Sequence, residues 1–94
     1  MEYSYIISRA CFDDLSGYID FKSYYCFEEN GRELVEVELD AVNNAAMIIA
    51  EAILDWQEHT AEELDEAYDI YAEAYSEEEV DYFTEMLELD RLEA

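Results

Sequence analysis

The chain has 94 residues, which fits one domain over residues 1–94, and its 27 Asp and Glu against four Lys and Arg give a formal net charge of −23. A surface this acidic repels nucleic acid and anionic membranes, so direct binding to either is disfavoured and a positively charged partner is indicated. Because 52% of the residues are apolar and 15% are aromatic, the chain should fold despite its charge.

The N-terminal part alternates between apolar and polar residues, which predicts a small antiparallel sheet of three strands. Residues 2–8 form the first expected strand, and residues 10–17 a loop or one short helical turn. Residues 18–27 alternate again, and one side of this expected strand carries Ile19, Phe21, Tyr25 and Phe27. The Asn30–Gly31 pair is typical of a hairpin turn, so residues 33–39 should return with Val35, Val37 and Leu39 inward, giving a hairpin over 18–39.

Three helices should follow the sheet, making the chain an α+β protein. Asp40 is placed to cap a helix over 41–58, which is apolar on most faces and expected to form the centre of the core. Its innermost stripe should contain Val42, Ala46, Ile49, Ile53 and Trp56. Thr60 with Glu63, and Ser76 with Glu79, match the Ser/Thr-x-x-Glu capping box and predict helices over 61–75 and 77–89.

The segment from Thr60 to Ala94 holds 14 of the 27 acids and one basic residue, Arg91. In the first of its helices a stripe that includes Tyr68 and Tyr71 should face inward, and in the second a stripe that includes Phe83 and Leu87, leaving the acids outside. Solvated helices normally mix Glu with Lys, since like charges a turn apart repel. Laid along about 52 Å of helix, these acids fall about 3.7 Å apart, close to the phosphate spacing of about 3.4 Å along one DNA strand.

Catalytic and metal motifs are lacking, so an enzyme is not expected, nor is a cofactor or metal site. His59 is the only histidine, and at the end of the expected helix over 41–58 it should be an ordinary surface residue. Zinc and di-iron sites require more histidines, and a calcium loop requires a central glycine that the acidic runs lack. Cys11 and Cys26 should be reduced thiols, with a disulfide as the alternative.

Small size, extreme acidity, helices lined with Asp and Glu, and scattered tyrosines make the chain resemble the phage-encoded acidic DNA-mimic inhibitors of the anti-CRISPR and anti-restriction type. The resemblance is one of type, centred on Glu62 to Glu73 and Glu77 to Glu88. It implies an inhibitor in the host cytoplasm that occupies the basic DNA- or RNA-binding surface of a defence nuclease or CRISPR effector subunit. No leader or long apolar run is recognisable in the sequence, which agrees with that compartment.

The residues expected to bind the partner are nine acids and two tyrosines. They are Glu62, Glu63, Glu66, Asp69, Glu73, Glu77, Glu78, Asp81, Glu85, Tyr24 and Tyr82. Two alternatives stay open: an immunity protein or antitoxin that neutralises a basic nuclease toxin, and an acidic module that binds cations or acts as a chaperone. The sequence leaves open the target, the stoichiometry, and whether the protein is a monomer or a homodimer.

Overall fold

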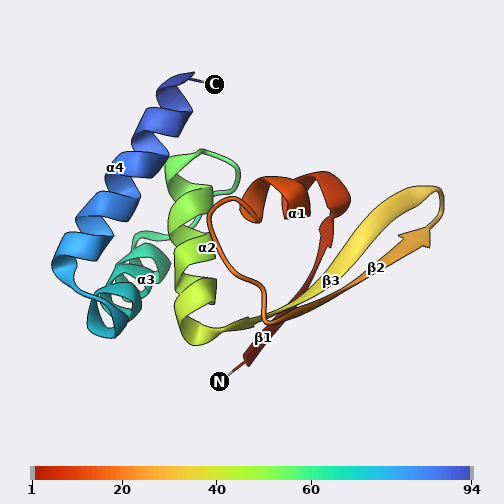
Figure 1. The fold of residues 1–94 in the computed structure, drawn as a ribbon, viewed down its shortest axis with the longest axis horizontal. Coiled ribbons are helices and arrows are strands. Elements are labelled where there is room, and N and C mark those ends of the chain that lie inside the picture. Colours follow the sequence, from red (N-terminus) through yellow and green to blue (C-terminus); the bar gives the residue numbers. More distant parts are fainter. Residues whose placement is uncertain (1, 94) are drawn as a thin grey trace. The chain divides into compact units, whose positions relative to one another are not determined.

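The structure, a computed structural model, describes residues 2–93. Within them the chain forms three strands and four helices, in the order β1, α1, β2, β3, α2, α3, α4 (Figure 1). The predicted α+β class and three-stranded antiparallel sheet are confirmed. A short helix after the first strand raises the number of helices from the predicted three to four.

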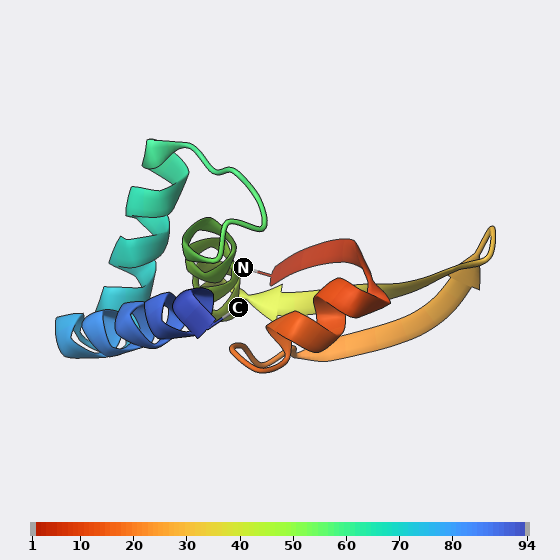
Figure 2. The ribbon, with the colours of Figure 1, turned by 90° about the horizontal axis from the view of Figure 1, so that it is seen from above.

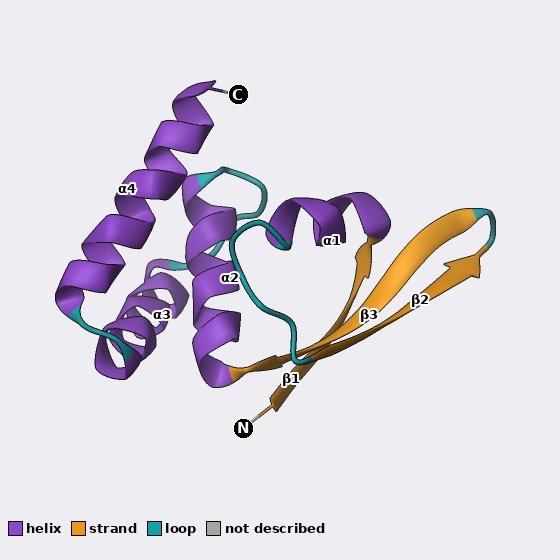
Figure 3. Ribbon diagram, viewed as in Figure 1, coloured by secondary structure: helices purple, strands orange, loops and turns teal. Residues whose placement is uncertain are grey.

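The chain divides into two compact units, Met1–Asn44 and Ala45–Ala94, named here the strand unit and the helical unit. The strand unit contains α1 and every strand of the described chain, whereas α3 and α4 belong to the helical unit (Figure 3). Helix α2 begins in the first unit and continues in the second. The assignment of residues 1–94 to one domain stays a prediction.

The sheet has the strand order β1-β3-β2, with both neighbouring pairs antiparallel. The strands are β1 (Glu2–Ser8), β2 (Ser23–Glu29) and β3 (Arg32–Asp40). A two-residue turn joins β2 to β3, where Asn30 has φ 53° and Gly31 φ 77°. Both residues occupy the positive-φ region that a two-residue hairpin requires, which explains why the Asn-Gly pair predicted this hairpin correctly.

Helix α1 (Arg9–Leu15) lies against one face of the sheet (Figure 2). Its Phe12 packs in the buried cluster with Val35 and Val37 of β3. The sequence predicted a loop or a single turn here, but the Ser8 hydroxyl accepts a hydrogen bond from the Cys11 amide at 3.1 Å and caps a longer helix. The cap and the buried Phe12 side chain stabilise this helix, although the polar residues of the segment are typical of a loop.

The predicted strand over residues 18–27 is wrong in its start and in its faces. Residues 18–22 follow α1 as a connecting segment, and β2 begins only at Ser23, after a bend. Because Tyr24 pairs with Val37 and Tyr25 with Glu36, Tyr24 shares the α1-covered face and Tyr25 the opposite, outer face. The bend interrupts the period-two alternation, so the segment before it does not share the register of the strand after it.

Helix α2 (Ala41–Ile53) starts as predicted, with the Asp40 carboxylate accepting a hydrogen bond from the Asn43 amide at 2.7 Å. It ends five residues before the predicted Glu58. Asp55 adopts φ 61°, and the Trp56 amide donates to the Glu51 carbonyl at 2.9 Å, as in a Schellman cap. Trp56 therefore lies 43% exposed in the turn, not in the core stripe where the helical pattern placed it.

Helices α3 (Ala61–Ala74) and α4 (Glu77–Glu93) begin at the two predicted capping residues. The hydroxyls of Thr60 and Ser76 accept hydrogen bonds from the backbone amides three residues later, both at 3.2 Å. The helices pack through the stacked rings of Tyr71 and Phe83, whose centroids are 5.2 Å apart. The inner side chains hold the pair together, so the acids of both helices remain available to solvent.

Candidate functional site

All nine acids predicted to bind a partner are exposed on α3 and α4. In residues 2–93, none of them forms an ion pair with a Lys or Arg. Four of them, Glu62, Glu63, Glu77 and Glu78, lie in the first turn of their helix. There the positive end of the helix dipole stabilises a negative charge, so the fold itself gives a reason for these four.

The other five predicted acids have no such structural reason. They lie beyond the first turn of either helix, at Glu66, Asp69, Glu73, Asp81 and Glu85. A carboxylate there gains nothing from the helix N-terminus and repels its neighbours one turn away. The helices therefore provide no structural reason for an acid at any of these five positions.

A groove between α3 and α4 brings three of the nine acids together. It has a volume of about 440 Å³ and is bordered by Asp69, Glu77 and Asp81. Its remaining lining comes from Tyr68, Ala72, Val80 and Thr84. Carboxylates beside the apolar side chains of Ala72 and Val80 suit a long cationic side chain, whose aliphatic stem can pack while its charged end pairs with a carboxylate.

The Tyr68 phenol at this groove differs from an exposed tyrosine. Burial raises its pKa, the Thr84 hydroxyl opposes that rise, and the negative charge of Glu88 adds to it. The Thr84 oxygen is itself buried without a well-formed hydrogen bond. Tyr68 therefore stays neutral at physiological pH and presents a polarisable ring and a hydroxyl beside the carboxylates.

The two predicted tyrosines lie on different units. Tyr82 is 68% exposed on α4, in the same helix as Asp81 and Glu85. Tyr24 is 61% exposed on β2, and its ring packs 4.9 Å from that of Phe12 in the strand unit. Tyr82 lies on one of the two acidic helices, whereas Tyr24 packs on the α1-covered face of the sheet.

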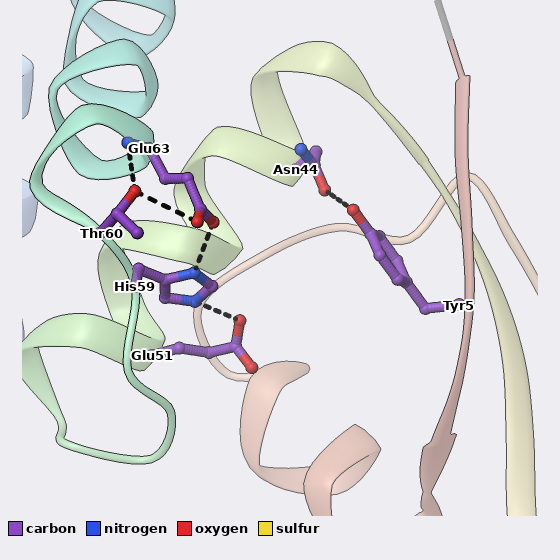
Figure 4. Close-up of polar contacts among 6 residues, drawn as sticks. All are labelled: Tyr5, Asn44, Glu51, His59, Thr60 and Glu63. Atoms are coloured by element: carbon purple, nitrogen blue, oxygen red, sulfur yellow. Dashed lines mark hydrogen bonds and ion pairs between the residues drawn. The ribbon is translucent and has the colours of Figure 1, made fainter.

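The side chain of His59 is largely buried and contacts both α2 and α3. The sequence predicted a surface residue at a helix end instead. His59 lies in the segment before α3, and its side chain is only 9% exposed. Its Nε2 lies 3.3 Å from a Glu51 oxygen and its Nδ1 3.2 Å from a Glu63 oxygen (Figure 4). Because α2 was expected to continue to residue 58, the sequence did not indicate that this segment contacts α2.

This contact shifts the two carboxyl groups in opposite directions. Burial raises the pKa of Glu51, and the hydrogen bond and charge of His59 oppose that rise. The pKa of Glu63 is lowered, first by its hydrogen bond with His59 and then by one with Thr60. Glu63, one of the nine predicted acids, thus already has structural partners and is the least available to a binding partner.

The geometry of His59 does not suit a metal ion held with both carboxylates. Its two ring nitrogens point to different edges of the imidazole, so Glu51 and Glu63 cannot join one nitrogen at a shared metal. Over residues 2–93, no group of three or more His, Cys, Asp or Glu side chains is placed to hold a metal. Helices long and apolar enough to cross a bilayer are also lacking in that part of the chain.

The sequence did not reveal the apolar outer face of the sheet, which lies opposite α1. Ile6 and Tyr25 are 62% and 68% exposed there. The predicted alternation grouped Tyr25 with Ile19 and Phe21, which are buried and half-buried, so it did not indicate that Tyr25 lies exposed on this face.

Comparisons with protein families, curated proteins and solved structures found no match to this chain.

Proposed function

We propose that the chain is a nucleic-acid-mimicking inhibitor, which binds the basic DNA- or RNA-binding surface of a nuclease or CRISPR effector subunit through the acids of α3 and α4. The observation that carries the proposal is a series of mostly exposed carboxylates along α3 and α4, accompanied by a single basic residue, Arg91, in the last turn of α4. The fold explains only those in the first turns. An acidic face kept against its own repulsion implies a cationic partner.

The spacing of charge supports mimicry. Helices α3 and α4 have 14 and 17 residues and together carry 14 acids. At about 1.5 Å per residue they present one acid per roughly 3.3 Å of helix, against about 3.4 Å per phosphate along a DNA strand. The two helices form a bent pair (Figure 2), so they offer a folded acidic surface in place of one straight rod.

The groove between α3 and α4 supplies a specific contact within this surface. An arginine from the target can place its stem on Val80 and Ala72 and its guanidinium near Asp69 or Asp81. Arginine side chains that bind phosphates present the same forked geometry to a carboxylate. Contacts of this kind are worth about 1 kcal/mol or less when exposed and more where water is excluded.

The test uses two fourfold charge reversals with equal change in net charge. The first converts Glu62, Glu66, Glu77 and Asp81 of α3 and α4 to Lys. The matched control converts four exposed acids of the strand unit to Lys, at Asp14, Asp20, Glu28 and Glu33. Circular dichroism establishes that each variant is folded, and a panel of CRISPR effectors and restriction nucleases is assayed for DNA binding with each protein.

The wild-type chain should displace DNA from at least one member of the panel, and the helix variant should lose this by about 100-fold or more. The strand-unit variant should retain it within about tenfold. Equal losses in both variants would mean that total charge, not α3 and α4, drives the association. Full inhibition by the folded helix variant would reject this surface.

A further inference from the structure

The outer face of the sheet carries an exposed apolar patch with a carboxylate at its centre. By strand register, Ile6 of β1, Glu36 of β3 and Tyr25 of β2 form one row across this face. Ile6 and Tyr25 are 62% and 68% exposed, and Glu36 between them is exposed as well. The row belongs to the strand unit alone.

The neighbouring row extends the patch. Leu34 pairs with Phe27, and both are half-buried on the same face. The rings of Tyr25 and Phe27 are stacked with their centroids 6.2 Å apart, which holds Tyr25 along the strand. Ile6, Tyr25, Phe27, Leu34 and Glu36 are named here the outer patch. Contiguous exposed apolar side chains on a soluble chain mark an interaction surface, and this one is ordered by the sheet beneath it.

Glu36 differs from Glu2 and Glu38 of the same face. Glu2 forms an ion pair with Lys22, and the carboxylate of Glu38 accepts a hydrogen bond from the Ser23 hydroxyl at 3.0 Å. Glu36 forms no ion pair with any Lys or Arg of the described chain. It is therefore a carboxylate with an aliphatic neighbour on one side, an aromatic neighbour on the other, and no cation.

We propose that the outer patch is a second docking surface, and that it takes an arginine side chain from a basic protein partner. The guanidinium pairs with Glu36 and stacks on the Tyr25 ring, while its aliphatic stem packs along Ile6. Each of these contacts is one that arginine makes better than lysine, because its planar group is weakly hydrated and forked. The inference concerns the strand unit and does not depend on mimicry by α3 and α4.

Charge argues against a second copy of the chain as the occupant. A two-fold contact through this face would bring Glu36 and Glu38 of one copy towards those of the other. Each copy carries a net charge of −23, so the repulsion extends beyond the patch itself. A cationic partner relieves that repulsion and supplies the missing counter-charge at Glu36.

The experiment is an amide NMR titration of the full chain with an acetylated, amidated octapeptide of alternating arginine and valine, and with its lysine counterpart. The amides of Ile6, Tyr25 and Glu36 should shift, with affinity for the lysine peptide at least about threefold weaker at these residues. Glu36→Gln should weaken arginine-peptide binding at the outer patch by about fivefold or more. Glu33→Gln, on the opposite face of the same strand, should change it less than about twofold.

Shifts confined to α3 and α4, or unchanged binding at the patch in Glu36→Gln, would overturn the proposal. Equal affinity for the two peptides would overturn the choice of arginine. Concentration-dependent shifts at Ile6 and Tyr25 without peptide, with a dimer in sedimentation, would assign the face to a second copy instead. Signals from α3 and α4 are read separately, so failure here and failure of the proposed inhibition are distinguishable.

Discussion

Like charges stand side by side in both units, but in the strand unit an arginine lies beside such a pair, whereas none of the nine predicted acids of α3 and α4 forms an ion pair with a Lys or Arg of the described residues. Glu28 and Glu33 oppose each other across β2 and β3, and Arg9 lines the same small pocket as both. The pKa of Arg9 is raised, first by its hydrogen bond with Asp13 and also by Glu33. On α3, Glu62 and Glu66 stand one turn apart with no Lys or Arg near either.

The numbers of charges follow the same division. Residues 1–44 hold ten acids and three basic residues, whereas residues 45–94 hold 17 acids and the single Arg91. Two salt bridges that involve Lys or Arg, Arg9–Asp13 and Lys22–Glu2, lie in the strand unit. The strand unit thus has a smaller excess of acids and pairs some of them with cations, whereas the helical unit has the larger excess, so the distribution of charge is uneven along the chain and not a property of composition alone.

The largest effect on the free energy of unfolding should come from the contact of His59 with Glu51 in the helical unit. His59→Ala leaves the buried Glu51, which is 8% exposed, without its partner and should cost about 2 kcal/mol of unfolding free energy. Tyr5→Phe, which removes the hydrogen bond to the buried Asn44 in the strand unit (Figure 4), should cost about 1 kcal/mol. Urea unfolding followed by Trp56 fluorescence measures the first and circular dichroism of the sheet the second.

A double variant sharpens this result. In His59→Ala with Glu51→Gln, the carboxylate that lost its partner is gone, so the cost should be smaller than the sum of the two single changes. Strict additivity would mean that His59 stabilises the loop by packing and not through Glu51.

The next largest effect should be that of salt, which should stabilise the two units to different extents. Raising NaCl from about 0.05 to 0.5 M screens the repulsion along α3 and α4 and should stabilise the helical unit by about 1 kcal/mol. The strand unit should gain less, because screening also weakens its ion pairs. Hydrogen exchange resolves amides in α3 and α4 from those in β3. A larger gain in β3 would contradict the division of charge described above.

Acid should act on the start of α3 through Glu63. A carboxyl with a lowered folded pKa contributes stability that is present above its unfolded value of about 4.3 and lost as pH falls through the folded value. Glu51, whose pKa is raised, works in the opposite sense: its contribution is present below that value and lost as pH rises. Glu63→Gln should therefore destabilise the helical unit near pH 7 and have no effect below its folded pKa.

The matched control for that titration is Glu62→Gln, a neighbouring exposed acid in the same turn with no hydrogen bond to His59. Because it lacks the His59 contact, Glu62→Gln should cost less unfolding free energy than Glu63→Gln near pH 7. Unfolding free energies from Trp56 fluorescence across the acid range test this, and identical profiles for the two variants would rule out a role for the His59 contact.

The smallest effect concerns a single surface charge. Glu66→Gln removes the repulsion with Glu62 one turn earlier and should stabilise α3 by a few tenths of a kcal/mol. Glu33→Gln, where Arg9 lies beside the acid, should give no gain or a slight loss. Thermal unfolding of the two variants side by side measures the difference, and a gain in Glu33→Gln equal to that in Glu66→Gln would remove the distinction between the units.

Local signals in the sequence predicted the elements whose ends are set by a single side chain. Thr60, Ser76 and Asp40 cap α3, α4 and α2 as expected, and Asn30–Gly31 forms the hairpin turn. The α2 end escaped prediction because no glycine or proline marks it: Asp55 takes the left-handed conformation that glycine usually provides. The error then moved Trp56 and His59 to positions they do not occupy.

The candidate surface was predictable in position but not in arrangement. Charge and periodicity placed all nine acids outside, as the exposed α3 and α4 residues are. Which acids gather around the groove depends on how α3 packs on α4 through Tyr71 and Phe83, and a helical pattern carries no information on that packing. Nor does it reveal that His59 contacts both Glu63 of α3 and Glu51 of α2, because the second contact depends on how the loop lies against α2.

The two-residue turn at Asn30–Gly31 decides which of two adjacent aromatic rings lies on the α1-covered face of the sheet and which lies on the outer face. Tyr24 packs on Phe12, while its neighbour Tyr25 lies on the other side of the sheet. Inserting or deleting one residue in this turn would exchange them, since the turn sets the register of β2 against β3 and successive side chains of a strand alternate sides. The length of the turn thus determines which ring each face of the sheet presents, and tolerance to insertions there is expected to be low even though both turn residues lie in a loop.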